Sequence, residues 1–535
     1  MSPHQKSLSF RVKHDAVPTH AKIVATIGPA SDTPEMLDRL IGQGVSVFRI
    51  NFSHGSLDDK GQLFTHIREA SARAGQCIAI LGDLQGPKMR VGEVPDLDDA
   101  GGIVVEAGDE VLFKRNQGEA GIMNGVATFD ATFDELYDDV KPGQRVLIND
   151  GAIRMLALGQ NRGESIRCTV TEGGRITSGK GINLPESDLS LPAITDRDWE
   201  CVRWAVDRGV DYLALSFVRT AEEVHMLVDR LREWCTPDLP WAESEVGMRI
   251  PVVVKIEKPQ AVDNLSEIIE ATDAVMVARG DLGVEMDVAK VPVIQKHILA
   301  KCCEQGKPCI VATQMLESMI DSPNPSRAEA SDVANAVFDG CDAVMLSGET
   351  AVGAHPDLVV ETMNRIIRVT ESRMDELAHA SGVPRDLKEY PFRSAALARG
   401  VWHIAEELGA KAVAVWSEAG GMARYLSQNN FRIPIFAYTS SPIGSRRMAL
   451  FGGVTPILTD PPGQGRLRDW TEIVESMLIE RGFVEERDPV LLVAGKPLGA
   501  ILAQSTVAIL RIGDQYSGFR VADDYESMPS AAAPL

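Results

Sequence analysis

Lys255 and Glu257 are the two residues whose types and spacing point most directly to chemistry. They end an apolar, β-branched run, and a run of this composition favours a strand. Side chains two positions apart on a strand lie on the same face, so the ammonium and the carboxylate should emerge side by side where the strand ends. A second apolar run ends in Arg279 and Asp281, also two positions apart. Two carboxylates beside a lysine indicate a divalent cation that holds an anionic substrate.

Eight short apolar runs are the predicted strands that must position these residues, and most are followed by a stretch with helical spacing. The expected strands are 22–28, 45–50, 77–81, 212–217, 252–256, 274–278, 309–312 and 343–346. Strands that alternate with helices favour a parallel sheet, and eight such units predict a closed (β/α)8 TIM barrel. In such a barrel the C-terminal strand ends meet around one point. A doubly wound open sheet is the alternative, but it would not bring so many strand ends together.

The chain of 535 residues is too long for one hydrophobic core. Glycine-rich sequence with short alternating runs after the third expected strand predicts a small all-β domain inserted as a lid over the barrel mouth. The expected boundaries are a leader at 1–20, the barrel at 21–90 and 191–370, the inserted β domain at 91–190, a C-terminal α/β domain at 385–513 and a tail at 514–535. After a linker at 382–391, the last domain is expected to have strands at 412–416, 433–438, 454–458 and 490–494 and helices at 393–408 and 467–481.

The composition argues against several classes of protein. Lysine and arginine number 54 against 76 acidic residues, for a net charge of −22, which disfavours broad electrostatic binding to nucleic acid or to an anionic membrane. No run approaches membrane-spanning length, and residues 1–20 contain no apolar signal-peptide core. The eight cysteines have no CxxC spacing and are expected to be reduced core residues. These features predict a cytoplasmic protein whose anion-binding site is positive only locally.

Seven stretches of the chain resemble the pyruvate kinase family. They are 26–31, 49–55, 255–257, 276–285, 312–319, 327–340 and 345–351. The expected β insertion and the C-terminal α/β domain also match that family's layout. The resemblance implies a glycolytic enzyme that transfers the phosphoryl group of phosphoenolpyruvate to ADP, giving pyruvate and ATP. It further implies Mg²⁺ as the cofactor, with Mn²⁺ as a substitute, and a homotetramer.

The resemblance also implies roles for the residues at the strand ends. Lys255 and Arg49 would supply cations to the transferring phosphoryl group, and Glu257 and Asp281 would hold the metal ion. The implied substrate-binding residues are Arg49, Lys255, Ala278, Arg279, Gly280, Asp281 and Thr313. The segment from Ala278 to Asp281 resembles a turn that opens a short helix, whose first N–H groups would receive the substrate carboxylate.

Thr313 matches the family's proton-delivery position. A hydroxyl alone is a poor acid, so it would act on the enolate of pyruvate through bound water. Ser347 and Glu349 would belong to the same relay, and for Ser347 a purely structural role is the open alternative. The implied nucleotide-binding residues are Asn51, His54, Arg90, Lys180 and Asn183.

The third expected strand departs from the K⁺-dependent members of the family. Those members have Thr, Lys and Glu where this chain has Leu84, Gln85 and Lys88. The monovalent-cation ligands would be Asn51, Ser53, Asp83 and the carbonyl of Leu84. Because a lysine beside this site brings a fixed positive charge, we expect Lys88 to replace K⁺ and the enzyme not to require it.

The C-terminal domain departs from the family pattern as well. Its loop at 417–422 lacks the arginine and most hydroxyls of a phosphate-binding loop, and the late loop is 495–500, so activation by a sugar bisphosphate is not expected. Two other functions remain open alternatives: a related barrel that handles phosphoenolpyruvate or pyruvate, such as a lyase or dikinase, and an inactive regulatory homologue. The presence of Arg49, Lys255, Glu257 and Asp281 argues against the inactive homologue.

Overall fold

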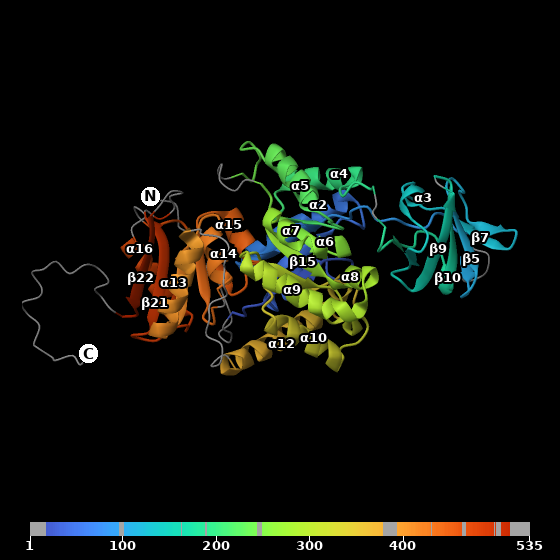
Figure 1. The fold of residues 1–535 in the computed structure, drawn as a ribbon. Helices are drawn as coiled ribbons and strands as arrows, with labels where there is room; N and C mark the ends of the chain where they lie inside the picture. Colours follow the sequence, from blue (N-terminus) through green and yellow to red (C-terminus); the bar gives the residue numbers. More distant parts are fainter. Residues whose placement is uncertain are drawn as a thin grey trace, which may run out of the picture.

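The computed structural model describes residues 18–513 except 96–100, 162, 188–189, 243–248, 378–392, 430, 463–466, 497 and 499–503. These residues form a closed barrel, an inserted β domain and a C-terminal α/β domain. The barrel lies in the middle, with the other two domains at opposite ends (Figure 1). The expected linker and tail lie outside the described residues, and so does the leader up to residue 17.

Eight parallel strands close the barrel, in the order β1-β17-β16-β15-β14-β13-β3-β2. They are β1 (Lys22–Thr26), β2 (Val45–Asn51), β3 (Ala79–Asp83), β13 (Tyr212–Leu215), β14 (Val252–Ile256), β15 (Ala274–Ala278), β16 (Cys309–Ala312) and β17 (Ala343–Leu346). The predicted (β/α)8 barrel is confirmed. The fourth strand ends two residues earlier than predicted, because Phe217 has a φ of +54° and leaves the extended conformation.

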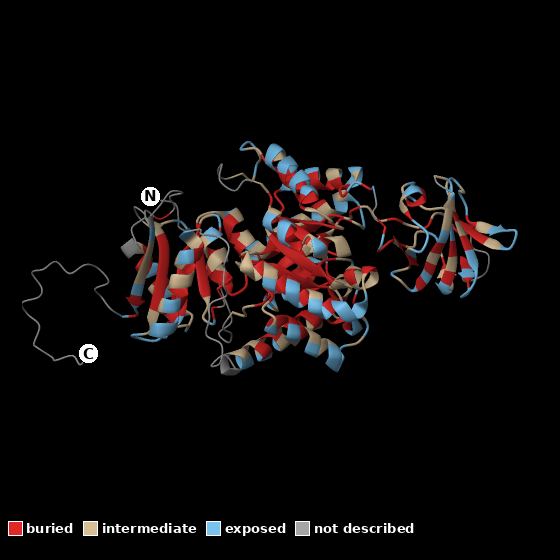
Figure 2. Cartoon of the chain, viewed as in Figure 1, coloured by how far each residue is buried: buried red, intermediate tan, exposed pale blue. Residues whose placement is uncertain are grey.

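Alternate residues of each barrel strand point into the barrel. In β14, Val253 belongs to the apolar cluster that fills the interior, whereas Val252 and Val254 belong to the cluster beneath the surrounding helices. Lys255 and Glu257 continue the inward series, so the prediction that they share a face is confirmed. Figure 2 shows the buried strands at the centre of the barrel and helices that are buried only on their inner faces.

The barrel helices begin and end at the signals that the sequence provides. For example, Thr195 and Asp198 form a capping box at the start of α4, and Gly209 ends that helix in the left-handed conformation. The helices are α1 (Pro34–Gly42), α2 (Leu57–Ala74), α4 (Asp196–Arg208), α5 (Ala221–Trp234), α6 (Pro259–Asp263), α7 (Leu265–Ala271), α8 (Arg279–Glu285), α9 (Val291–Glu304), α10 (Arg327–Phe338), α11 (Gly348–Ala351) and α12 (Pro356–Leu377), with short 3₁₀ helices at Val288–Lys290 and Glu317–Ile320.

The inserted domain is built from a seven-stranded sheet, β12-β8-β9-β10-β5-β7-β6, and a two-stranded sheet, β11-β4. Its strands are β4 (Ile103–Val105), β5 (Glu110–Lys114), β6 (Gly121–Met123), β7 (Val126–Phe129), β8 (Arg145–Ile148), β9 (Ile153–Asn161), β10 (Ser165–Glu172), β11 (Gly174–Ile176) and β12 (Ile182–Asn183). The prediction of an all-β insertion overlooked one helical turn, α3 (Leu136–Asp139). Leu136 and Tyr137 of this turn are fully buried in the domain's core, which explains its presence.

The C-terminal domain contains a five-stranded sheet, β20-β19-β18-β21-β22. Its elements are α13 (Arg393–Leu408), β18 (Ala412–Trp416), α14 (Gly421–Ser427), β19 (Ile435–Thr439), α15 (Pro442–Met448), β20 (Val454–Leu458), α16 (Leu467–Glu480), β21 (Pro489–Lys496) and β22 (Gln504–Arg511). The sequence did not predict β22, which pairs antiparallel with β21 at the sheet edge. Such an edge strand carries the weaker alternation of a half-exposed face.

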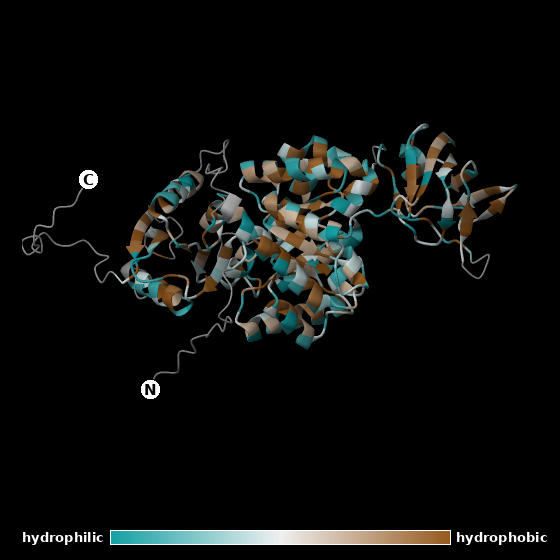
Figure 3. Ribbon diagram, turned by 90° about the horizontal axis from the view of Figure 1, so that it is seen from below, coloured by the Kyte–Doolittle hydropathy of each residue, from teal (hydrophilic) through white to brown (hydrophobic). Residues whose placement is uncertain are grey.

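Two further observations concern the surface and the core. One cluster of buried apolar side chains runs from the barrel interior into the C-terminal domain, so the two are packed together. Figure 3 shows hydrophobic colour concentrated on the central strands and hydrophilic colour on the outer turns of the helices.

Among the described residues, no helix has the length and apolarity needed to span a membrane. All eight cysteines are free, and Cys77 and Cys303 are partly exposed.

Candidate active site

Lys255 lies at the centre of a charge cluster at the C-terminal end of the barrel. Its Nζ is 2.9 Å from Glu257 Oε1 and 3.4 Å from Asp83 Oδ1. The same Nζ donates a hydrogen bond of 2.9 Å to the hydroxyl of Ser216, and that hydroxyl donates to the carbonyl of Leu84 at 2.6 Å. Only 12% of the lysine side chain is exposed. The ammonium is therefore fixed in position by three neighbouring strands.

Arg49, near the C-terminal end of β2, is the second cation of this cluster. Its Nε and Nη2 both lie 2.6 Å from Asp83 Oδ2, and its Nη1 donates to Thr26 Oγ1 at 3.0 Å. The Thr26 hydroxyl in turn donates to the carbonyl of Leu346. Asp83 thus binds both Arg49 and Lys255, which places two cations side by side, as an anionic substrate requires.

The charge balance differs between the carboxylates. Burial alone would raise the pKa of Asp83, but Lys255 and Arg49 outweigh it and hold that pKa below its usual value. Burial would lower the pKa of Lys255, but Asp83 and Glu257 raise it, so the ammonium stays charged. Burial raises the pKa of Glu257 to about 7 against the effect of Lys255, and the charge of Asp281 adds to the rise. The two cations beside Asp83 thus outweigh its burial, whereas Lys255 alone does not outweigh the burial of Glu257, so a bound cation would favour the charged form of Glu257.

Glu257 and Asp281 fit a divalent metal ion. Glu257 is 0% exposed, its Oε1 pairs with the ammonium of Lys255 at 2.9 Å, and its Oε2 accepts the N–H of Phe217 at 2.7 Å. The described part of the chain holds no group of three or more His, Cys, Asp or Glu side chains arranged as a metal cage. Two carboxylates without a cage suit Mg²⁺, which keeps several waters and takes further oxygen ligands from substrate phosphates.

Arg279 and Asp281 do not repeat the arrangement of Lys255 and Glu257, as the sequence pattern had suggested. Strand β15 ends at Ala278, and Arg279 begins helix α8, on which residues two apart do not face each other. Arg279 Nη1 pairs with Asp332 Oδ2 at 2.7 Å, and its Nη2 donates to the carbonyl of Thr313 at 2.7 Å. Its guanidinium braces the loop after β16, whereas the Asp281 charge acts on Lys255 and Glu257.

Thr313 lies just beyond β16 in a strained conformation. Its φ is +70° and that of Gln314 is +55°, in the left-handed region that a β-branched residue rarely adopts. The Thr313 hydroxyl accepts a 2.8 Å hydrogen bond from the N–H of Gly280 and donates to the carbonyl of Ala312. The first turn of α8 and the end of β16 are thus joined through this one hydroxyl. The predicted helix opening at Ala278 to Asp281 is confirmed.

Ser347 and Glu349 lie together at the end of β17. Glu349 Oε2 accepts the N–H of Ser347 at 2.6 Å, and its Oε1 accepts the N–H of Leu316 at 3.2 Å. The Ser347 hydroxyl is buried and has no hydrogen-bond partner among the described residues. Glu349 is thus engaged with two backbone groups, while the hydroxyl of Ser347 remains available to a bound molecule.

The residues expected at the nucleotide fall into two groups. Asn51 accepts the N–H of Ser53 at 3.0 Å, and the exposed His54 follows in the same loop after β2. Arg90, Lys180 and Asn183 lie at the junction of the barrel and the inserted domain: Arg90 donates to the carbonyl of Gly179 at 2.9 Å, and Asn183 donates to Glu285 at 2.9 Å. The first group lies at the C-terminal end of β2 and just after it. The second group lies on the segments that join the inserted domain to the barrel.

The side chain of Lys88, which follows β3 in the chain, points toward the inserted domain. A Cβ atom added to Gly181 would lie 3.4 Å from Lys88 Cε, so this side chain lies against the inserted domain. Its neighbours around a small cavity include Asn183, Phe217 and Lys258. The carboxylate of Asp83 is paired with Arg49 and Lys255, and the carbonyl of Leu84 already accepts the Ser216 hydroxyl.

Two buried charged residues of this region were not predicted as part of the site. Lys258 Nζ pairs with Glu285 Oε1 at 2.6 Å, with 10% and 0% of the side chains exposed. Lys258 directly follows Glu257, but its partner lies 27 positions away. A pairing between two βα units has no local sequence signal. The one available clue was that Lys258 directly follows Glu257, which places Lys258 near the site but does not identify Glu285 as its partner.

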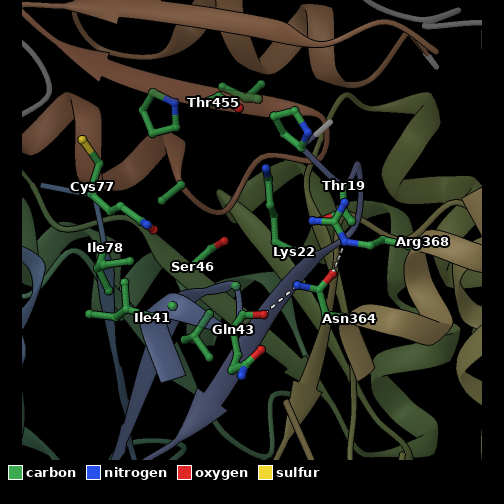
Figure 4. Close-up of a pocket in the computed structure, with 18 of the residues that line it drawn as sticks. Thr19, Lys22, Ile41, Gln43, Ser46, Cys77, Ile78, Asn364, Arg368 and Thr455 are labelled. Atoms are coloured by element: carbon green, nitrogen blue, oxygen red, sulfur yellow. Dashed lines mark hydrogen bonds between the residues drawn. The ribbon is translucent and has the colours of Figure 1, made fainter. Parts of the chain in front are cut away.

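A second cavity, of about 890 Å³, lies at the opposite end of the barrel, where Lys22 and Ser46 face Thr455 of the C-terminal domain. In Figure 4, Asn364 bridges Gln43 and Arg368 on its wall. Burial lowers the pKa of Lys22 there to about 8 against the opposing charge of Glu371. The packed barrel interior separates this cavity from Lys255, so it is no part of the candidate active site.

The fold is a (β/α)8 barrel whose C-terminal end brings the cations Arg49 and Lys255 together with the carboxylates of Asp83 and Glu257. Comparison with known proteins gives the family. Two family models match this chain, the barrel domain of pyruvate kinase over residues 19–360 and its alpha/beta domain over residues 395–510. The chain therefore belongs to the pyruvate kinase family and is a phosphotransferase of that family.

Similar proteins cover nearly the whole chain. A pyruvate kinase of Corynebacterium glutamicum is 39% identical over 498 residues, which span 92% of this chain and 98% of the relative. One from Mycobacterium tuberculosis is 38% identical over 496 residues, with the same coverage of 92% and 98%. The crystal structure of a pyruvate kinase from Cryptosporidium parvum superposes with a TM-score of 0.83 at 31% identity, over 92% of this chain and 96% of the other. The predicted family and the three-part architecture are confirmed, and members of this family need a divalent metal ion.

Proposed function

We propose that this enzyme transfers the phosphoryl group of phosphoenolpyruvate to ADP, giving pyruvate and ATP, at the C-terminal end of its barrel. The observation that carries the proposal is the position of Lys255, buried between Asp83 and Glu257 with Arg49 on the far side of Asp83. A phosphoryl group in transfer spreads negative charge over its oxygens, and fixed cations in a water-poor site stabilise that charge.

Glu257 and Asp281 are the residues that would hold Mg²⁺, or Mn²⁺ in its place. When bound, the ion would supply positive charge to the carboxylate and phosphoryl oxygens of phosphoenolpyruvate. Glu257 is suited to this role because burial raises its pKa in spite of Lys255, so a bound cation would favour its charged form. Ala278, Arg279 and Gly280 lie at the start of α8, next to Asp281 in the chain, and their backbone would border the bound substrate.

Lys255 and Arg49 would bind the transferring phosphoryl group, and the ammonium would neutralise charge as it develops on the bridging oxygen. Once phosphoryl transfer has left an enolate, a proton must reach its carbon. Thr313 would orient a water for that step, because its hydroxyl is already fixed by Gly280 and Ala312. Ser347 would extend the relay, since its buried hydroxyl has no partner among the described residues.

ADP would bind where the inserted domain meets the barrel. Arg90 and Lys180 would contact its phosphates, with Asn183 beside them and Asn51 and His54 on the facing loop. Arg90 and Asn183 already bridge the two domains through hydrogen bonds. Closure of the inserted domain would then bring the acceptor phosphate against phosphoenolpyruvate and exclude water.

The enzyme would need no K⁺, because this chain has Lys88 where K⁺-dependent members of the family have a glutamate, and its fixed charge would replace a cation held by Asn51, Ser53, Asp83 and the Leu84 carbonyl. We further propose a homotetramer that acts in the cytoplasm and binds neither nucleic acid nor membrane. The homotetramer is what the family implies. The net charge of −22 disfavours binding to nucleic acid or to an anionic membrane.

The test is pyruvate formation from phosphoenolpyruvate, ADP and Mg²⁺ in buffer freed of K⁺, and again with K⁺ added. Equal, high activity in both buffers is expected. Activity only with K⁺ would keep the reaction but refute the role of Lys88. No pyruvate in either buffer, from folded protein, would refute the proposed reaction and favour an inactive regulatory homologue.

A further inference from the structure

Glu285, the last residue of α8, gathers three separate segments on one buried carboxylate. It is 1% exposed, and its Oε1 accepts hydrogen bonds from Lys258 Nζ at 2.6 Å and from Asn183 Nδ2 at 2.9 Å. Its Oε2 has no hydrogen-bond partner among the described residues. Lys258 follows β14, Glu285 ends the helix after β15, and Asn183 belongs to β12 of the inserted domain. Two barrel units and the inserted domain therefore meet at this point.

The Lys258–Glu285 ion pair joins the two segments that carry the proposed metal ligands. Lys258 is the residue immediately after Glu257, and Glu285 lies four positions after Asp281 on α8. Residues four apart lie on the same face of a helix. The ion pair thus spans the same two segments as the metal site, one step farther from the barrel axis.

A second contact connects Lys258 to Glu257. The ammonium of Lys258 lies 5.7 Å from the centroid of the Phe217 ring, within the range of a cation–π interaction. The N–H of Phe217 donates a 2.7 Å hydrogen bond to Glu257 Oε2. Phe217 has a φ of +54°, and such a conformation persists only when neighbouring contacts hold it. Lys258 therefore packs on the residue that orients the carboxylate of Glu257.

We propose that Lys258 and Glu285 form a positioning pair that sets the separation of the Glu257 and Asp281 carboxylates, and that Asn183 couples the inserted domain to this pair. The inference rests on the proposed metal site. Both side chains of the pair are almost fully buried, where an ion pair is held firmly and water competes little. Through Asn183, the inserted domain and the metal-binding segments share one carboxylate, so the position of one affects the other.

The first experiment measures Mn²⁺ binding by calorimetry with Mn²⁺ alone, without substrates. We expect Lys258→Met and Glu285→Gln each to weaken Mn²⁺ binding about tenfold, because outer groups that orient metal ligands carry effects of this size. The double variant should lose no more than either single variant, since the two residues act as one pair. The double variant also leaves no lone buried charge, so it separates the metal effect from a folding defect. Lys258→Arg should restore most of the affinity.

A matched control exists at the other end of the same two units. Arg249 and Asp273 precede β14 and β15, and their side chains pair at 2.6 Å. Arg249→Met removes an ion pair between the same segments but far from Glu257. We expect it to lower the melting temperature without changing Mn²⁺ affinity. An equal loss of affinity in Arg249→Met would show that general packing, and not the Lys258–Glu285 pair, sets the metal site.

The coupling to the inserted domain is tested with ADP. Asn183→Ala should raise the KM for ADP severalfold and weaken Mn²⁺ binding less than Glu285→Gln does, because the Lys258–Glu285 pair remains. If Asn183 acts through Glu285, Asn183→Ala should add nothing further to the KM of Glu285→Gln. Additive increases in KM would overturn this part of the inference, because Asn183 would then act on the nucleotide independently.

Failure of the inference can be told apart from failure of the proposed metal site. If Glu257→Gln and Asp281→Asn bind Mn²⁺ as tightly as the unmodified enzyme, the assignment of the metal ligands is wrong. If those two variants lose Mn²⁺ binding but Lys258→Met and Glu285→Gln keep it, the ligands stand and the positioning pair is refuted.

Discussion

At the N-terminal end of the barrel, Asp211 is held by two guanidinium groups, whereas at the C-terminal end Glu257 and Asp83 share the ammonium of Lys255. Asp211 lies 2.8 Å from Arg68 and 2.8 Å from Arg446. Burial would raise the pKa of Asp211, but these two arginines lower it. Burial of Glu257 raises its pKa to about 7 in spite of Lys255. Two guanidinium groups thus outweigh the burial of Asp211, whereas one ammonium, which Glu257 shares with Asp83, does not outweigh the burial of Glu257.

The difference indicates a structural role for the cluster around Asp211 and a functional role for the cluster around Lys255. Arg446 belongs to α15 of the C-terminal domain, so the cluster around Asp211 joins two domains and stabilises the fold. The cluster around Lys255, in which the burial of Glu257 is only partly offset, lies beside strained backbone, with positive φ at Phe217, Thr313 and Gln314. Incomplete charge balance and strain are features of functional sites, because a bound ligand supplies what the protein lacks.

The largest effect is expected from Lys255→Met. Losing one fixed charge that stabilises the transition state lowers kcat on the order of 10²–10³-fold. The fold should survive, because Glu257 has a raised pKa and takes up a proton once its counter-charge is gone. Steady-state pyruvate formation and a melting curve measure the two properties. A kcat within severalfold of the unmodified enzyme would refute the role of Lys255.

The next effect, at the other end of the barrel, is on stability. Asp211→Asn leaves two guanidinium groups without their carboxylate and should lower the free energy of unfolding by about 3 kcal/mol, with kcat retained. The pKa of Asp211 is lowered in the folded chain, so its contribution is present above the pKa of the unfolded chain and lost as the pH falls through the lower folded value. Denaturant unfolding at neutral and acidic pH should show the difference between the two proteins shrinking in acid.

A smaller effect is expected for metal binding as the pH changes. Protons and metal compete for Glu257, whose pKa is raised to about 7. Its protonated fraction therefore grows as the pH falls, and Mn²⁺ binding should be about tenfold weaker at pH 6 than at pH 8. Calorimetry across this range, in buffers that do not bind Mn²⁺, provides the measurement. Affinity that does not change with pH would show that Glu257 is ionised throughout, as its counterparts at the N-terminal end are.

The smallest effect concerns Lys88. Lys88→Glu replaces a fixed cation with a carboxylate and should lower activity severalfold in K⁺-free buffer, with K⁺ restoring it, because the new charge favours a bound cation. Lys88→Gln is the matched control, since it removes the charge without adding a ligand, and K⁺ should restore it less. Full activity of Lys88→Glu without K⁺ would refute the replacement of K⁺ by this lysine.

Much of the fold was predictable from the sequence because its signals are local. The β-branched runs, the helix caps and the turn glycines each act over a few residues, and the barrel follows from their alternation. Strand β22 was not predicted, since an edge strand is recognised mainly by its partner β21. The turn α3 was overlooked because Leu136 and Tyr137 are fixed by the core of the inserted domain and not by a repeating pattern.

The site residues were likewise predictable where the signal is local and unpredictable where it is long-range. Lys255 and Glu257 were predicted to share a face from strand geometry alone, and their ion pair confirms it. The analogous expectation for Arg279 and Asp281 was wrong, because β15 ends at Ala278 and helix α8 begins at Arg279. The pairing of Lys258 with Glu285 joins different βα units, and no spacing within one segment encodes such a contact. Long-range ion pairs had to be found in three dimensions.

The most direct test of the account is the location of bound Mn²⁺ in a crystal of the enzyme with phosphoenolpyruvate, found by anomalous scattering. One Mn²⁺ peak is expected between Glu257 and Asp281, about 2.0–2.4 Å from an oxygen of each, as hard cations bind carboxylates. The phosphoryl group of phosphoenolpyruvate should lie within reach of Lys255 and Arg49. A Mn²⁺ peak that contacts neither carboxylate would contradict the assignment of the C-terminal end of the barrel as the site of phosphoryl transfer.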